Sequence, residues 1–296
     1  MKQKSFLATL LILICSLALV PTACSPGPAD TTPAIAPPVV AFSSVEDGIM
    51  VGDSTTLFWI VTGTDSVQID PDIGGGLPAV GTVLVSPASD TTYTLTASNS
   101  VGSAMQSVTI TVISPKPLML SSLDRITLKP SDDIDDSMLD ELKARLEQTF
   151  GCPVESEVYY YDFEAAQASQ QKQYLAEKLI YQLRNAGYTN GEKVLGVVDV
   201  DFYSPGSYFI LGKAELGGEV GVISVVRLRQ RYYRLLSEEE TILHRATKEA
   251  LHELGHTLGL EHCPDTTCVM YYSLSVSDTD RKLPAFCDIC RLKVEN

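Results

Sequence analysis

Residues 252–262 read His-Glu-Leu-Gly-His-Thr-Leu-Gly-Leu-Glu-His, and this run limits the possible folds and activities more than any other stretch of the chain. His252 and His256 are four residues apart, so a helix places their imidazoles one turn apart on the same face. Two such side chains can hold one metal ion. Glu253 follows His252 and would project beside the metal, where its carboxylate can take a proton from a water molecule as general base.

The second half of the run provides a third ligand. Gly259 can adopt a left-handed conformation without steric cost, so the helix can end there and the chain can bring His262 back to the metal. Three neutral imidazoles leave the fourth position of zinc open for water, as in catalytic sites. The chain has 4 histidines and three of them lie in this run, which makes an incidental group of histidines the weaker interpretation.

Four cysteines follow directly. Cys263 and Cys268 form a C-x4-C pair, and Cys287 and Cys290 form a C-x2-C pair. Four thiolates in two short-spaced pairs suit a closed tetrahedral zinc site, and we favour this interpretation. Two disulfides are the alternative, which the export argued below keeps open. The sequence therefore predicts two zinc ions per chain, one catalytic and one structural.

Residues 252–290 resemble the archaemetzincin signature, in which the three-histidine motif is followed at once by a cysteine, then by C-x4-C-x-M and C-x2-C. The spacer between Met270 and Cys287 is slightly shorter than in the family pattern. The resemblance extends over residues 118–293 and is strongest upstream in Lys193–Tyr203, Phe209–Ala214, Ser224–Leu228 and Lys248–Ala250. It implies a zinc-dependent metallopeptidase of the metzincin clan that acts on peptides or proteins, with Met270 as the apolar floor beneath the metal.

The N-terminus has the features of an export signal. Residues 1–23 begin with two lysines and continue in the apolar stretch Phe6–Val20, which is too short for a confident membrane span. Small residues before Cys24 resemble a bacterial lipobox, although Pro21 stands where leucine is usual. We expect a lipid on Cys24 to anchor the protein to the membrane at the cell surface or in the periplasm. Residues 24–38 then form a Pro- and Thr-rich linker. Cleavage without lipidation, giving a secreted protein, is the alternative.

Residues 39–114 change in character. Short runs of Val, Ile, Thr and Tyr alternate with Gly, Asp, Asn and Ser at the spacing of a β-sandwich. Trp59 lies in a predicted core strand, Leu57–Val61, and Asp90–Gly102 resembles the late strands of bacterial immunoglobulin-like modules. We expect an all-β immunoglobulin-like sandwich that serves as a spacer in preference to an adhesion module.

Residues 115–296 are predicted to form the catalytic domain. The expected elements are a strand at 123–128, helices at 134–150 and 165–186, strands at 194–200, 207–211 and 220–226, and a long helix ending near 258. Ser237–Glu240 fits a capping box that opens this last helix. The order suits an α+β fold of metzincin type with the active site beneath the sheet.

Two further expectations concern the surroundings of the site. By the resemblance, Phe209–Leu211 is an edge strand that pairs with an extended substrate. Tyr272, two residues after Met270, is interpreted as a packing residue of the pocket wall, with an oxyanion donor as the alternative. Asp199 and Asp201, at the end of a strand, are interpreted as turn or salt-bridge residues in preference to functional ones.

The charge of the chain excludes several partners. The formal net charge is −15, and removal of two lysines with the signal leaves 20 basic against 37 acidic residues, or about −17. This charge argues against nucleic acid and against electrostatic attraction to anionic lipid. We expect a monomer. Two other functions remain open: a surface adhesion lipoprotein with a vestigial metal domain, and a zinc hydrolase of a non-peptide amide. Cleavage preference and the restraint of activity are not predicted.

Overall fold

The structure is a computed structural model, and it describes residues 35–114, 116–167, 172–229 and 239–295. The predicted signal peptide, Cys24 and most of the linker lie outside these residues, as does the beginning of the predicted capping box at Ser237. All the helices and strands of the described residues lie in the compact unit Ala36–Asn296. Among the described residues, a helix with the length and apolarity needed to cross a membrane is not found.

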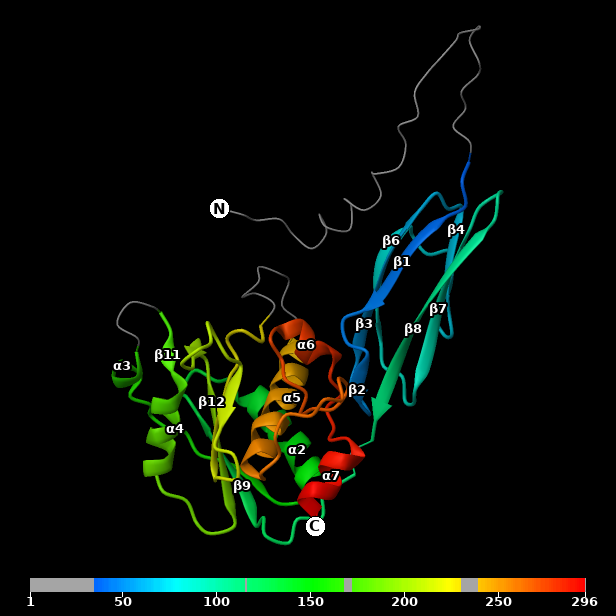
Figure 1. The fold of residues 1–296 in the computed structure, drawn as a ribbon. Coiled ribbons are helices and arrows are strands. Elements are labelled where there is room, and N and C mark those ends of the chain that lie inside the picture. Colours follow the sequence, from blue (N-terminus) through cyan, green and yellow to red (C-terminus); the bar gives the residue numbers. More distant parts are fainter. Residues whose placement is uncertain (1–34, 115, 168–171, 230–238, 296) are drawn as a thin grey trace, which may run out of the picture. The chain divides into compact units, whose positions relative to one another are not determined.

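Residues 39–113, which we call the N-terminal β-region, consist of strands in two sheets (Figure 1). One sheet has the order β1-β3-β6, and its strands are β1 (Val39–Ser44), β3 (Thr55–Thr62) and β6 (Val80–Val85). The other has the order β2-β8-β7-β4-β5, and its strands are β2 (Gly48–Met50), β8 (Ser103–Ile113), β7 (Thr91–Ser98), β4 (Ser66–Asp70) and β5 (Gly74–Gly75).

The alternating pattern of strand β3 explains why the two sheets share one core. Its residues Leu57, Trp59 and Val61 are buried, whereas Phe58 between them is exposed. Trp59 was predicted to lie in a core strand, and its indole N–H donates to the carbonyl of Pro78 at 2.9 Å. A Cβ atom at Gly81 would lie 2.4 Å from this ring, so the bulky indole fits only because β6 has a glycine there.

The rest of the chain is built on a five-stranded sheet with the order β10-β9-β12-β15-β14. Its strands are β10 (Val154–Ser156), β9 (Arg125–Pro130), β12 (Glu192–Val198), β15 (Val220–Ser224) and β14 (Gly212–Ala214). All neighbours are parallel except β14, which runs antiparallel to β15 at the edge. A small second sheet pairs β11 (Tyr174–Leu175) with β13 (Phe202–Tyr203).

Helices cover both faces of the five-stranded sheet (Figure 1). Helix α4 (Ala176–Asn185) lies on one face, and α2 (Asp136–Phe150) and α5 (Glu239–Thr257) lie on the other. The remaining helices of the described residues are α3 (Phe163–Ala166), α6 (Val276–Arg281) and α7 (Asp288–Glu295). Strand β12 shows the consequence: Val194 and Val198 pack with α4 in one core, whereas Leu195 and Val197 pack with α2 and α5 in the other. This arrangement explains the unbroken apolar run that predicted a buried strand at 194–200.

The region predicted as one helix at 165–186 is divided. Its described residues form the end of α3, strand β11 and helix α4. A single helix was therefore a wrong prediction. The local pattern was outweighed by a long-range contact, because Tyr174 and Leu175 pair with Phe202 and Tyr203 in the second sheet.

Candidate metal centre and its cleft

Helix α5 presents the histidine motif. Its apolar residues Ala246, Ala250 and Leu254 recur at intervals of four and are buried against the sheet, which leaves the adjacent flank for polar side chains. The helix ends at Thr257, and Gly259 then has φ +88°, as expected for a glycine that reverses the chain. The amide of Gly259 donates to the carbonyl of His256 at 2.9 Å.

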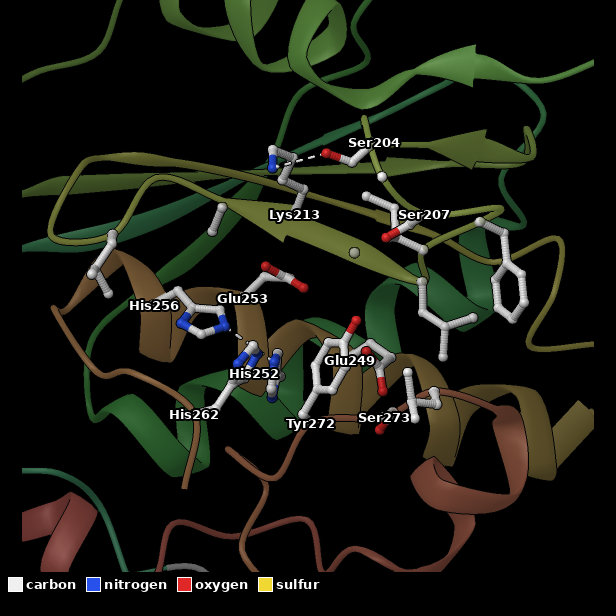
Figure 2. Close-up of a pocket in the computed structure, with 18 of the residues that line it drawn as sticks. Ser204, Ser207, Lys213, Glu249, His252, Glu253, His256, His262, Tyr272 and Ser273 are labelled. Carbon is white, nitrogen blue, oxygen red and sulfur yellow. Dashed lines mark hydrogen bonds between the residues drawn. The ribbon is translucent and has the colours of Figure 1, made fainter. Parts of the chain in front are cut away.

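The reversal brings three imidazoles together, as predicted. The candidate ligand nitrogens of His252, His256 and His262 lie within 4.8 Å of one another, and the first two Nε2 atoms are 3.1 Å apart (Figure 2). The opposite ring nitrogens face backbone carbonyls: Nδ1 of His252 lies 2.8 Å from the oxygen of Val269, and Nδ1 of His256 lies 2.6 Å from that of Leu260. An Nδ1–H donated to a carbonyl leaves Nε2 with the free electron pair that a metal requires.

The protonation of the three histidines suits the same role. Burial lowers the pKa of His252 well below its usual value, and the charge of Lys282 lowers it further. The same two causes contribute to lowering the pKa values of His256 and His262. All three imidazoles are therefore neutral at physiological pH. Neutral imidazole is the form that binds metal ions.

Glu253 lies between these ligands and the sheet. Its carboxylate is buried, and its Oε2 atom has no hydrogen-bond partner among the described residues. Burial and the charge of Glu249 raise the pKa of Glu253 well above its usual value, whereas Lys282 and Lys213 oppose this rise. A buried carboxylate oxygen is normally paired in a folded protein. The unpaired oxygen therefore indicates a position where a further group, such as a polarised water molecule, would bind.

Two glycines make room for this arrangement. A Cβ atom at Gly255 would lie 2.4 Å from Sδ of Met270, so the buried methionine packs directly beneath the helix, as the resemblance implied. A Cβ atom at Gly212 would lie 2.3 Å from Oε1 of Glu253. Strand β14 therefore passes close above the carboxylate only because its first residue lacks a side chain.

The imidazoles open into a cleft of about 970 Å³. Strand β14 and the preceding loop form one wall, and Tyr272, Ser273 and Leu274 form part of the other (Figure 2). The edge strand is Gly212–Ala214, so the prediction of Phe209–Leu211 was wrong by three residues. Ile210 makes only an isolated bridge to Phe202, and pairing with β15 starts where Gly212 permits the close approach to Glu253.

The four cysteines also converge. The Sγ atoms of all four lie within 4.8 Å of one another, and the pairs Cys263–Cys287 and Cys268–Cys290 are each 3.8 Å apart. A disulfide requires about 2.05 Å. Sulfur atoms at about 2.3 Å from a central zinc in a tetrahedron are themselves about 3.8 Å apart. The arrangement therefore fits a zinc ion, and it does not contain disulfides.

The interpretation of the two aspartates at the end of β12 as salt-bridge residues is confirmed. The carboxylate of Asp201 accepts two hydrogen bonds from Arg227, at 2.5 and 2.6 Å, and Asp199 pairs with Arg229. The guanidinium of Arg227 also lies 4.1 Å from the ring centroid of Phe209 in the cleft wall. These pairs support the loop before β14 and do not reach the imidazoles.

Two polar pairs beside the cleft were not predicted. Lys282 is fully buried and contacts Glu249 at 3.2 Å, and Thr279 donates to the same carboxylate at 2.9 Å. On the opposite wall, Lys213 lies 3.2 Å from Glu177 and 3.2 Å from the hydroxyl of Ser204. The two members of each pair are far apart in sequence, so the sequence did not indicate the pairing. Only Glu249 gave a signal, because its spacing from the histidines places it on the same face of α5.

Residues 105–296 match the sequence profile of peptidase family M54. The archaemetzincin of Methanocaldococcus jannaschii is 34% identical over 177 residues, which cover 58% of this chain and 93% of that protein. That of Pyrococcus horikoshii is 40% identical over 138 residues, or 46% of this chain and 71% of that protein.

Crystal structures of archaemetzincins show the same likeness. That from Methanopyrus kandleri has a TM-score of 0.50 and 33% identity, covering 59% of this chain and 95% of its own. That from Archaeoglobus fulgidus has a TM-score of 0.50 and 32% identity, covering 57% and 99%.

Proposed function

Because this chain belongs to peptidase family M54, the archaemetzincins, and is thereby a zinc metallopeptidase, we propose that it cleaves peptide bonds with Glu253 as general base. One observation carries this proposal: three neutral imidazoles meet beside a buried carboxylate whose Oε2 has no partner among the described residues, at the floor of an open cleft. A vestigial metal domain would have no need of such a base. His252, His256 and His262 are the proposed ligands of the catalytic zinc.

The zinc ion would supply Lewis-acid polarisation of the scissile carbonyl and of a water molecule. Glu253 takes the proton from this water at its carboxylate and returns it to the nitrogen of the leaving amine. Burial and the charge of Glu249, which raise the pKa of Glu253, make the carboxylate a better base than an exposed one. The carbonyls of Val269 and Leu260 hold His252 and His256 in their orientations throughout.

The edge strand β14 is the proposed binding site for the peptide backbone. It pairs with β15 on one side, and it is the last strand in the order of the sheet. Among the described residues no strand pairs with its other edge, so an extended peptide could pair there and cross the cleft above the three imidazoles. Recognition through backbone hydrogen bonds demands little of substrate side chains, so we expect cleavage of peptides with several sequences.

The four cysteines are proposed to bind a second, structural zinc ion. The proposal is supported by four converging sulfur atoms at tetrahedral spacing, three of them buried. Elemental analysis should give two zinc ions per chain, and mass spectrometry should find the four thiols unoxidised. One zinc ion together with two oxidised cysteine pairs would contradict the proposal.

We further propose that the protein is exported and anchored through a lipid on Cys24, and that the N-terminal β-region is an immunoglobulin-like sandwich. The apolar leader and the small residues before Cys24 support the first proposal. Two sheets around one core support the second. Metabolic labelling with palmitate should mark the wild-type protein in membranes. Secretion of unlabelled wild-type protein would instead favour simple signal cleavage.

The experiment that tests the enzymatic proposal is digestion of a peptide library by the purified full chain, with and without a zinc chelator. Cleavage that disappears with chelator and returns with added zinc is the expected result. Failure to cleave any peptide, under conditions in which the chain retains zinc, would contradict it. Amide release from small non-peptide substrates would then be the activity to measure.

A further inference from the structure

Two carboxylates of the N-terminal β-region are buried although charged groups normally face water. Glu46, between β1 and β2, is 2% exposed, and Asp53, after β2, is 8% exposed. An isolated buried carboxylate is strongly unfavourable and requires cationic partners. Both residues precede residue 105, where the likeness to the peptidase family begins. Both carboxylates therefore lie outside the part of the chain that matches the family.

The partners come from helices α2 and α5. Glu46 accepts a hydrogen bond from Lys248 at 2.9 Å and contacts Nδ1 of His244. Asp53 accepts two hydrogen bonds from Arg145, at 2.7 and 2.5 Å, and lies 3.0 Å from Nε2 of His244. We call these five residues the ionic junction. Both ring nitrogens of His244 lie close to carboxylates, so the imidazolium charge would be compensated on both sides.

The electrostatics support a charged histidine. Burial disfavours the imidazolium, but the hydrogen bonds and charges of Asp53 and Glu46 outweigh this cost and raise the pKa of His244 to about 9. Burial raises the pKa values of the two carboxyls, but Lys248 and His244 lower the pKa of Glu46, and His244 and Arg145 lower that of Asp53, so both values are lowered overall. Lys248 is 1% exposed, so its ammonium group also depends on Glu46. The junction is therefore an interlocked set of buried charges.

The junction lies on the helix that carries the metal motif. Steps of four along α5 lead from His244 to Lys248, then to His252 and His256. Successive members of this series are about one turn apart. Lys248 Nζ also lies 3.3 Å from the carbonyl of Asp280 in α6. One ammonium group thus joins the β-region, α5 and the segment that follows Met270.

A close backbone approach connects the same three parts. A Cβ atom at Gly48 would lie 2.1 Å from Cδ2 of Leu283, so strand β2 lies directly against the chain after α6. The residue before Leu283 is Lys282, which pairs with Glu249 at the edge of the cleft. Movement of the β-region would therefore act on both the helix and the segment that hold the floor of the site.

We propose that Glu46 and Asp53 are positioning residues through which the N-terminal β-region holds α5 in the place its metal ligands require. The β-region is on this account a working part of the enzyme, which replaces the expectation of a spacer. The inference concerns the position of α5, so amide exchange and metal retention test it whether or not the peptidase activity proposed above is found.

The test compares full-length wild-type protein with Glu46→Gln and with the matched control Asp47→Asn. Glu46→Gln keeps the size of the side chain and removes the charge that His244 and Lys248 require. Asp47 is the neighbouring residue, is exposed, and loses the same charge in its variant. We expect Glu46→Gln to lower the Tm by about 10 °C. Amide hydrogen exchange across residues 241–258 should become at least about tenfold faster. The control should match wild type in both.

A second variant separates positioning from a general loss of stability and serves if Glu46→Gln does not fold. In Glu46→Gln/Lys248→Met both members of the pair lose their charge, so an uncompensated ammonium is no longer buried. We expect this double variant to recover most of the wild-type Tm and part of the protection of α5. If the double variant is instead as unstable as the sum of its single changes, Glu46 and Lys248 do not act as a pair and the proposal is overturned.

Metal retention is the decisive measurement. Zinc release to a competing chelator is measured at 20 °C, where the folded variants are compared. We expect Glu46→Gln to release the zinc ion held by the histidines at least about tenfold faster than wild type does, and at least about tenfold faster than Asp47→Asn does. A lower Tm with unchanged zinc release and unchanged exchange in 241–258 would show that the junction only attaches the β-region, and the positioning proposal would be wrong.

Discussion

Helix α5 carries histidines at both ends, and their surroundings give them opposite properties. His244 at the beginning of the helix lies between the carboxylates of Glu46 and Asp53, which raise its pKa to about 9. His252, two turns later, is equally buried but lies near the cation Lys282, and its pKa is lowered well below the usual value. One imidazole therefore remains charged and serves as an ion-pair partner. The other remains neutral and is available to a metal.

This comparison teaches that burial alone does not decide the role of a histidine. Both side chains lose almost all contact with water, and burial opposes the charged form of each. The sign of the nearest charges decides the outcome. The two ends of α5 should consequently respond to different changes. The end with His252 should respond to the removal of a base or a metal ligand, and the end with His244 to the removal of charge or to alkaline pH.

The largest effect is expected at the metal end, from Glu253→Gln. The amide fits the same space but cannot accept the proton of the attacking water, so kcat/KM should fall by about 10²–10⁴-fold. Zinc content and the exchange of α5 amides should be unchanged. The exposed residue Glu155 provides a control, and Glu155→Gln should retain wild-type activity. Wild-type turnover by Glu253→Gln would remove Glu253 as the base.

The second effect concerns the ligands. His262→Ala should weaken zinc binding at the catalytic site by more than about 100-fold, because even changes to groups that only support a ligand cost 10–100-fold. The cysteine site should keep its zinc, since its four sulfur atoms are separate from the imidazoles. Metal analysis after mild dialysis against chelator should thus find one zinc ion per chain instead of two. A variant that keeps two would exclude His262 as a ligand.

The third effect is a pH dependence at the charged end. His244 binds its proton more tightly in the folded chain than in the unfolded chain, because its pKa rises from 6.5 to about 9. Its stabilising contribution is complete below about pH 6.5 and is lost as the pH rises through about 9, at about 1.4 kcal/mol per unit of pKa difference. Over this range Glu46 and Asp53, whose pKa values are lowered, stay ionised, and the other charged groups that face them are Lys248 and Arg145.

The measurement is the Tm at pH 6, 7.5 and 9.5 for wild type and His244→Gln. The wild-type Tm should decrease by about 10 °C more than that of the variant, because only the wild type loses the ion pairs with Glu46 and Asp53. The difference between the two proteins removes the contributions of other groups that titrate over the same range. Parallel pH profiles would show that His244 is not charged in the folded protein.

The smallest effect is expected for Tyr272→Phe. The ring of Tyr272 lies 4.7 Å from that of His262 and is 45% exposed in the wall of the cleft. Phenylalanine keeps this contact, so kcat should remain within a few-fold of wild type. A loss of about 100-fold in kcat with little change in KM would instead assign the hydroxyl to the oxyanion.

The positions of the candidate ligands could be predicted because they depend on local geometry. His252 and His256 lie on one face of any helix that contains them, and Gly259 adopts the left-handed conformation that lets His262 return. The convergence of the four cysteines was likewise expected from their spacing. The edge strand was predicted three residues too early in the chain. The strand begins at Gly212 because only a glycine can pass so close to the carboxylate of Glu253, and this contact is not visible in the sequence.

The surroundings that tune these groups could not be read in the same way. Lys282, which lowers the pKa values of the three histidines, is 30 residues from His252, and its side chain is fully buried although lysine normally faces water. Glu46 is 198 residues from His244 in sequence. The composition of 39–114 predicted a β-rich region without chemistry of its own. Its acidic residues became informative only when their partners were known.

Local geometry acts over a few residues, so the amino-acid order alone indicated which histidines of α5 share one face and which thiols lie close together. The charge that each histidine carries depends on burial and on charged groups that the packing of distant segments brings near it. Electrostatic interactions are strong in such a buried environment. Tertiary structure therefore decided that His244 lies between two carboxylates, that the pKa of His252 is lowered, and that Oε2 of Glu253 has no hydrogen-bond partner among the described residues.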